Sequence, residues 1–113
     1  MNVTIVPYNL ADSVPTPKSE CGWIAIYEGE AIGWNSLIFE SHDTIKFANA
    51  YVKEEYRGNG VYRKLWNARM DFCKENLKGW NVVTYCFPST YGFYKDKGWE
   101  EVRTSTLFKS KIQ

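Results

Sequence analysis

Cysteine, histidine and long hydrophobic runs are all scarce in this sequence. The longest unbroken apolar stretch, Trp23–Tyr27, has five residues, far short of the ~18 that a transmembrane helix needs. The three cysteines, Cys21, Cys73 and Cys86, are odd in number and lack metal-binding or redox spacing. Residues 1–10 show no basic start followed by an apolar stretch, as a secretory signal would. We therefore expect a cytoplasmic protein with reduced thiols, no metal site and no membrane segment.

Neither sign of charge dominates the chain. The net charge is +1, which argues against a nucleic-acid-binding protein. Residues 1–52 carry two basic and six acidic side chains, net −4, whereas residues 53–113 carry twelve basic and seven acidic ones, net +5. This distribution is compatible with an anionic ligand on the second half and a cationic ligand near the first.

Apolar and aromatic side chains, in contrast, are abundant. Hydrophobic residues make up 44% of the 113 residues and aromatic residues 17%, whereas disordered chains have few aromatics and a high net charge. A chain of this size buries roughly two-thirds of the surface that its unfolded form exposes, which is enough for one core but not for two. The composition predicts a single domain over residues 1–113.

The first half of the chain is patterned for antiparallel strands. Alternating, β-branched or aromatic residues predict strands over 3–6, 23–27, 31–39 and 44–52. The turn at Glu28–Glu30 joins the second and third of these strands into a hairpin, and Gly33 predicts a bulge or a close backbone approach. Pro15 and Pro17 exclude regular structure between the first two strands.

The periodicity changes after Gly60. Val61, Leu65, Ala68, Phe72, Cys73 and Leu77 recur at helical spacing, and Gly79 is placed to end this helix. Further segments predict a strand at 82–87, a short helix at 89–97 capped by Ser89, and strands at 99–102 and 105–112. The order of elements predicts a mixed α/β fold around one sheet.

A glycine-containing turn, Arg57–Gly60, links a predicted strand to the start of the long helix. Glycine allows a tight turn and lets an anion approach the main chain. The first amides of a helix have no intrahelical partner and lie at the positive end of its dipole, so they attract phosphate groups. We expect a pyrophosphate-type anion held mostly by main-chain N–H groups; the alternative is a simple strand-to-helix connection.

This turn resembles the acetyl-CoA-binding motif of the GNAT N-acetyltransferases, Arg/Gln-x-x-Gly-x-Gly/Ala. Arg57 matches its first position and Gly60 its fourth, whereas Tyr62 stands at the sixth, where glycine or alanine is usual. The segment 93–99 is similar to the family's Phe-Tyr-x-x-x-Gly-Phe stretch, and 28–33 resembles the hairpin and the following Val-Gly of its second and third strands. The sequence is identified as a small, N-terminally shortened member of this superfamily over residues 22–113.

The resemblance implies an α/β fold with a single mixed, mostly antiparallel twisted sheet and two helices, like the acyl-CoA N-acyltransferases but without their usual first helix pair. It implies acetyl-CoA as the acyl donor, in a gap where the fourth and fifth strands separate. The pantetheine arm would pair with the backbone of Ala50, Tyr51 and Val52. The pyrophosphate would contact Arg57, Gly58, Asn59, Gly60, Val61, Tyr62 and Arg63.

The family transfers an acetyl group by direct attack of an amine on the thioester, and Tyr94 falls where the family has its proton-donating tyrosine. A phenol is protonated at neutral pH and can protonate a departing thiolate; the alternative is an aromatic that only packs on the sheet. No proton acceptor is apparent, because the strand positions that often carry one read Ala48-Asn49-Ala50 and Val82-Val83-Thr84. Phe87 replaces the family's helper asparagine.

The acceptor is an amine that the sequence does not identify. Because two helices do not fit between the first two strands, we expect an acceptor site that is open or completed by a second copy in a homodimer. The acidic first half favours a cationic amine, on a small molecule or on a protein.

Two other functions stay open at this stage. One is a catalytically inactive GNAT-like protein that binds CoA or acts as an inhibitor or interaction partner. The other is an aromatic-rich module that binds sugars or single-stranded nucleic acid.

Overall fold

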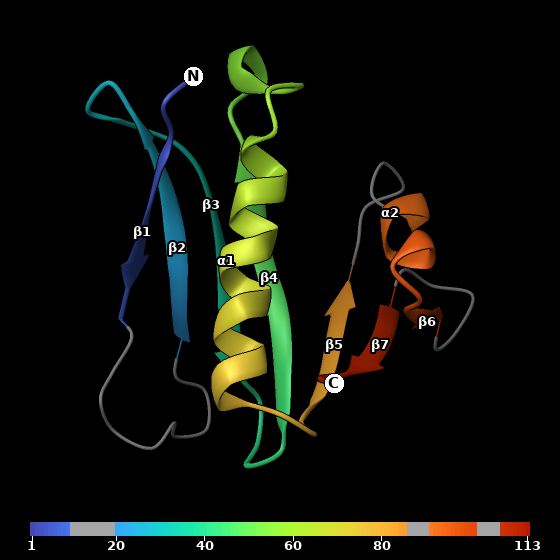
Figure 1. Cartoon of the computed structure of the whole chain (residues 1–113). Helices are drawn as coiled ribbons and strands as arrows, with labels where there is room; N and C mark the ends of the chain where they lie inside the picture. Colours follow the sequence, from blue (N-terminus) through green and yellow to red (C-terminus); the bar gives the residue numbers. More distant parts are fainter. Residues whose placement is uncertain (10–19, 86–90, 102–106) are drawn as a thin grey trace.

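The computed structural model describes residues 1–9, 20–85, 91–101 and 107–113. Its elements in chain order are β1 (Thr4–Tyr8), β2 (Glu20–Tyr27), β3 (Glu30–Phe39), β4 (Thr44–Val52), the 3-10 helix η1 (Glu54–Tyr56), α1 (Val61–Asn76), β5 (Asn81–Tyr85), α2 (Tyr91–Asp96), β6 (Glu100–Glu101) and β7 (Leu107–Lys111). Figure 1 shows one sheet, with its seven strands in the order β1-β2-β3-β4-β5-β7-β6. The β4–β5 pair is parallel and the other five pairs are antiparallel. The predicted mixed, mostly antiparallel sheet is confirmed.

The edge strand β1 contains a proline without breaking its pairing with β2. Pro7 aligns with Trp23, and a residue without an N–H is tolerated at a sheet edge because one side of the strand has no partner strand. The strand extends past Pro7 to Tyr8, beyond the predicted 3–6. The expectation that no helix pair precedes β2 concerns residues 10–19, which lie outside the described residues.

Both predictions for Gly33 are confirmed. The register of β2 and β3 shifts between Ala25 and Ile26, opposite this glycine, which is a β-bulge. A Cβ at position 33 would lie 2.9 Å from the carbonyl oxygen of Tyr51 on β4. The backbones of β3 and β4 therefore approach one another too closely here for a side chain.

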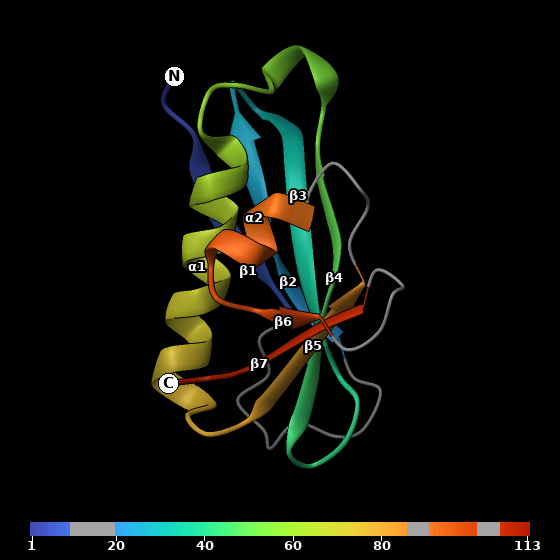
Figure 2. The same ribbon diagram turned by 90° about the vertical axis from the view of Figure 1, so that its right-hand side faces the viewer.

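Both helices cover the same side of the sheet (Figure 2). Helix α1 buries Val61, Leu65, Cys73 and the residue that ends it, Leu77, as its helical spacing predicts. Trp66 of α1 contacts the ring of Tyr94 on α2 at a centroid distance of 5.8 Å. Aromatic packing therefore positions the short helix α2 against the long one.

Strands β4 and β5 separate part of the way along their length (Figure 1). Their parallel register runs from Thr44 opposite Asn81 to Phe47 opposite Thr84 and continues no further within the described residues. At that point the Thr84 hydroxyl donates a hydrogen bond of 3.1 Å to the carbonyl oxygen of Phe47. Beyond it, β4 pairs only with β3 among the described residues, which leaves its other edge for an extended ligand.

The remaining boundaries agree with the predicted elements to within a few residues. Helix α2 starts at Tyr91 and ends at Asp96. Cys86, Phe87 and the predicted cap Ser89 lie outside the described residues. No helix in the described ranges combines the length and the hydropathy of a membrane-spanning segment.

Candidate active site

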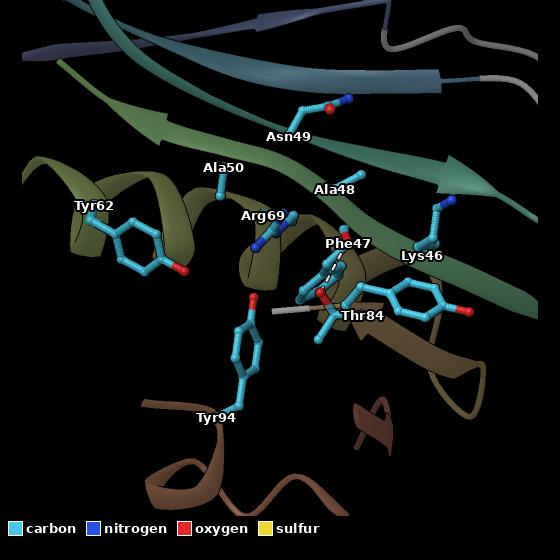
Figure 3. A pocket seen from close by; sticks show the side chains of 10 residues that line it. Lys46, Phe47, Ala48, Asn49, Ala50, Tyr62, Arg69, Thr84 and Tyr94 are labelled. Carbon is cyan, nitrogen blue, oxygen red and sulfur yellow. Dashed lines mark hydrogen bonds between the residues drawn. The ribbon is translucent and has the colours of Figure 1, made fainter. Parts of the chain in front are cut away.

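A cavity of about 300 Å³ lies where β4 and β5 separate. It is bordered by β4, β5, α1 and α2, and Figure 3 shows side chains from all four elements around it. The lining residues are Lys46, Phe47, Ala48, Asn49, Ala50, Tyr62, Arg69, Thr84, Tyr85 and Tyr94. A pocket of this volume is in the range for a small-molecule site.

A second bulge shapes the β4 side of the cavity. Tyr51 aligns with Trp34 and Ala48 with Ser36, so Asn49 and Ala50 together face a single residue of β3. Asn49 has a φ of 54°, and its amide donates a hydrogen bond of 3.0 Å to the Oγ of Ser36. Figure 3 shows this side chain directed away from the cavity. The bulge therefore leaves mainly backbone and the small side chains of two alanines on the cavity side of β4.

The glycine turn lies at the end of the same strand. Gly58 and Gly60 have φ values of 81° and 80°, and a Cβ at either position would meet nothing within 4 Å. Glycine is therefore needed for its backbone conformation rather than for space. Helix α1 has no side-chain cap, and its first backbone bond runs from the N–H of Lys64 to Gly60 at 3.1 Å. The three preceding amides have no intrahelical partner.

Arg57 and Asn59 fix the shape of this turn. The Nε of Arg57 donates a hydrogen bond of 2.8 Å to the carbonyl of Val52, and its guanidinium lies 5.5 Å from the ring centroid of Tyr51. The Asn59 amide donates to the carbonyl oxygens of Tyr56 and Arg57. These two side chains thus bind the protein's own backbone, whereas Arg63 of α1 is exposed.

Tyr94 enters the cavity from α2. It is 4% exposed, and its ring packs edge-on against Trp99 with centroids 5.1 Å apart. Figure 3 shows its hydroxyl directed into the cavity, toward Arg69 of α1. The structure therefore brings Tyr94 next to the open part of β4. These two parts of the site are more than forty residues apart in the sequence.

Arg69 is the residue that sequence reasoning missed. It is 1% exposed, and its Nη1 donates a hydrogen bond of 2.9 Å to the carbonyl of Ser36. Its guanidinium lies 3.8 Å from the ring centroid of Phe47. Burial lowers the pKa of this group below its ordinary value, while the nearby oxygens of Tyr94 and Tyr62 act in the opposite direction.

The sequence did hold a signal for this residue. Arg69 falls in the exact i, i+4 series of buried positions 61, 65, 69, 73 and 77, so a charged residue interrupts the apolar stripe. A polar residue on the buried face of an amphipathic helix usually needs a structural or functional partner. Thr84 was also not expected to line a cavity, and Tyr62, expected to contact the pyrophosphate, lines this one.

None of the described residues that line the cavity carries a carboxylate. Within the described residues, no three histidine, cysteine, aspartate or glutamate side chains lie close enough to hold a metal ion.

Solved structures with the same fold include several acetyltransferases. A GNAT-family acetyltransferase from Staphylococcus aureus Mu50 has a TM-score of 0.72 at 19% identity, over 85% of this chain and 70% of that one. The GNAT-family N-acetyltransferase YhbS from Escherichia coli, solved in complex with CoA, has a TM-score of 0.65 at 23% identity, over 82% and 59%. A Klebsiella pneumoniae structure has a TM-score of 0.73 at 13% identity and aligns over 98% of both chains.

The sequence comparison identifies the family. None of the curated proteins matches this chain. The model of the acetyltransferase (GNAT) family, however, matches residues 6–99, which include the β4 edge, the glycine turn and Tyr94. This chain belongs to the GNAT family of acetyltransferases.

Proposed function

We propose that the protein is an acetyl-CoA-dependent N-acetyltransferase whose acyl donor lies between β4 and β5. The observation that carries the proposal is the open edge of β4 beside the uncapped start of α1. An extended chain can pair with a free strand edge, and a diphosphate can bind free amides at a helix N-terminus. Coenzyme A has both parts in one molecule, and the related YhbS was solved with it.

The binding residues follow from this placement. The pantetheine arm would pair with the backbone of Ala50, Tyr51 and Val52, which lie beyond the last β4–β5 pair. The diphosphate would accept hydrogen bonds from the amides of the turn and of the first helical residues, Gly58 to Arg63. The thioester then lies in the cavity, within reach of Tyr94.

The chemistry needs two proton transfers. The nitrogen of a neutral amine attacks the thioester carbonyl carbon, the C–S bond breaks, and the hydroxyl of Tyr94 protonates the departing thiolate. The proton that the amine loses passes to water, because no carboxylate is found among the described residues that line the cavity. Solvent then reprotonates the Tyr94 oxygen. The acceptor is an amine of a small molecule or a protein, and the acidic first half of the chain favours a cationic one.

One observation favours a second candidate function. The lack of a carboxylate among the described lining residues also suits an inactive family member that binds CoA and serves as an inhibitor or interaction protein.

Calorimetry and thermal melting test the proposal. At 100 times its dissociation constant, acetyl-CoA should stabilise the fold by about 2.7 kcal/mol. ADP, which has the diphosphate but no pantetheine arm, is the matched control and should bind more weakly. No heat and no shift with acetyl-CoA would exclude the enzyme. Binding without thiol release across a panel of amines would favour the inactive alternative.

A further inference from the structure

Arg69 is a buried cation without a carboxylate partner in the described part of the chain. The three ion pairs found there, Lys46–Glu40, Lys53–Glu30 and Lys109–Glu100, do not involve it. Its Nη1 donates a hydrogen bond to the backbone carbonyl of Ser36, and the guanidinium also donates a hydrogen bond to the hydroxyl oxygen of Tyr94. Its buried Nε has no hydrogen-bond partner among the described residues. This guanidinium is therefore only partly satisfied.

Burying such a group is unfavourable unless something compensates its charge. Arginine is almost never fully buried without a partner. The rings of Phe47 and Trp66, with centroids 3.8 and 5.7 Å from the guanidinium carbon, supply part of the compensation. They accept no conventional hydrogen bond, so the Nε–H still lacks an acceptor.

The unsatisfied guanidinium borders the cavity. Figure 3 shows Arg69 near the centre of the lining, with the hydroxyls of Tyr62 and Tyr94 directed toward the same space. Arg69 and Lys46 are cationic and none of the ten lining residues is acidic. Lys46 already has Glu40 at 3.3 Å, so Arg69 is the cation with capacity for a ligand. The electrostatics of this cavity favour an anion.

We propose that Arg69 binds a carboxylate on one of the two reactants, either the acceptor amine of the proposed acetyl transfer or an acyl group that takes the place of acetyl. A guanidinium can donate two parallel hydrogen bonds to a carboxylate. The inference rests on the proposed function, because a thioester between β4 and Tyr94 places the acyl group beside Arg69. The carboxylate belongs either to a short dicarboxylic acyl donor or to an acceptor amino acid, and a cavity of about 300 Å³ limits either to a small group.

Two four-carbon thioesters test the donor. Succinyl-CoA ends in a carboxylate, whereas butyryl-CoA ends in a methyl group. Calorimetry with the wild-type protein should show at least tenfold tighter binding of succinyl-CoA. Arg69→Met should abolish this preference, and Arg69→Lys should restore part of it, because lysine keeps the charge but not the two-pronged geometry. Lys74→Met, at an exposed cation on the same helix, is the matched control and should keep the preference.

Lysine and its decarboxylated analogue cadaverine test the acceptor, with acetyl-CoA as donor. If the carboxylate is on the acceptor, Arg69→Met should raise the KM for lysine at least tenfold and leave that for cadaverine unchanged. A structural role would instead lower the melting temperature and affect all substrates alike. Arg69→Met should melt at or above the wild-type temperature, because an apolar side chain of similar volume often replaces a buried ion without loss of stability.

Each outcome decides the proposal. A carboxylate preference in either arm supports it and identifies which reactant carries the group. If coenzyme A thioesters bind but neither arm shows a preference in the wild-type protein, the proposal is overturned even if Arg69→Met does not fold. If no thioester binds, the proposed function fails, and free succinate then decides. If free succinate raises the melting temperature of the wild-type protein but not that of Arg69→Met, the anion site is supported. If succinate shifts neither, the anion site is contradicted.

Discussion

The hydroxyl of Tyr94 is proposed to protonate the thiolate sulfur of coenzyme A as it departs. The ring of Tyr94 packs against Trp66 and Trp99, so Tyr94→Phe removes the hydroxyl and keeps the packing. Turnover should fall at least tenfold, whereas acetyl-CoA affinity should change less than twofold, because the proposed pantetheine site consists of backbone. Thiol release and calorimetry measure the two quantities.

Tyr27→Phe is the control for this substitution. Tyr27 lies on β2 against Tyr56 and does not line the cavity, so its hydroxyl should not affect the reaction. Equal turnover of wild type and Tyr94→Phe would remove Tyr94 from the mechanism.

Two cysteine residues should be unreactive in the folded protein. Burial raises the pKa of Cys73 from 9.0 to about 12 and that of Cys21, with a smaller contribution from Glu20, to about 11. The thiolate is the reactive form, and at pH 9 it is populated for these residues only in the unfolded chain. Because the pKa values of these thiols are higher in the folded state, their protonated forms stabilise the folded protein relative to the unfolded chain. This contribution to the free energy of unfolding is present below pH 9 and is lost as the pH rises toward 11 and 12.

Iodoacetamide at pH 9 followed by peptide mapping tests this expectation. Cys21 and Cys73 should stay unmodified in buffer and become fully alkylated in denaturant. Rapid modification of either residue in buffer would show that its thiol is accessible.

At the scale of elements, the start of α1 depends on two glycines with positive φ. Gly60→Val should cost about 1–2 kcal/mol of folding free energy, because a β-branched residue is strained in this conformation. It should also weaken acetyl-CoA binding at least tenfold, since a distorted turn misdirects the amides that are proposed to bind the diphosphate. Calorimetry and urea unfolding measure the two effects.

The matched control lies beyond the other end of the same helix. Gly79 has a φ of 82° and open space around its Cα, so Gly79→Val imposes a similar strain far from the turn. It should lose similar stability and keep its affinity for acetyl-CoA. An equal loss of affinity in both variants would attribute the effect to general destabilisation and contradict the proposed diphosphate site.

At the scale of the whole molecule, the sheet consists of two parts joined by one short parallel ladder. Strands β1–β4 with α1 form one part, and β5–β7 with α2 form the other, with four register pairs between β4 and β5. A ligand in the cavity contacts both parts. Acetyl-CoA should therefore slow amide hydrogen exchange on the β4 edge, at residues 48–52, and in α2, and leave the distant edge strand β1 unchanged.

Mass spectrometry of the exchanged peptides measures this pattern. Protection confined to the start of α1 would indicate that only the diphosphate binds. That result would contradict the placement of the pantetheine arm between the two parts of the sheet.

The sequence by itself determined the order of the elements, the hairpin around Gly29, the bulge at Gly33 and the turn before α1. Each of these depends on neighbours along the chain: alternation of side chains in strands, helical spacing in α1, and backbone conformations that glycine adopts most easily. The glycine turn and the segment around Tyr94 each resemble a motif of the same family, and their order and separation along the chain fit that family.

Only the tertiary structure decided what faces the cavity. Arg69 looks like an exposed residue when hydrophobic positions alone are counted, but Phe47, Trp66, Tyr94 and Trp99 come together from β4, α1, α2 and the segment before β6. Their packing turns this face of α1 inward. Likewise, the bulge at Asn49 depends on pairing with β3. Local patterns specify elements, whereas the surroundings of a charge depend on contacts between residues that are distant in the chain.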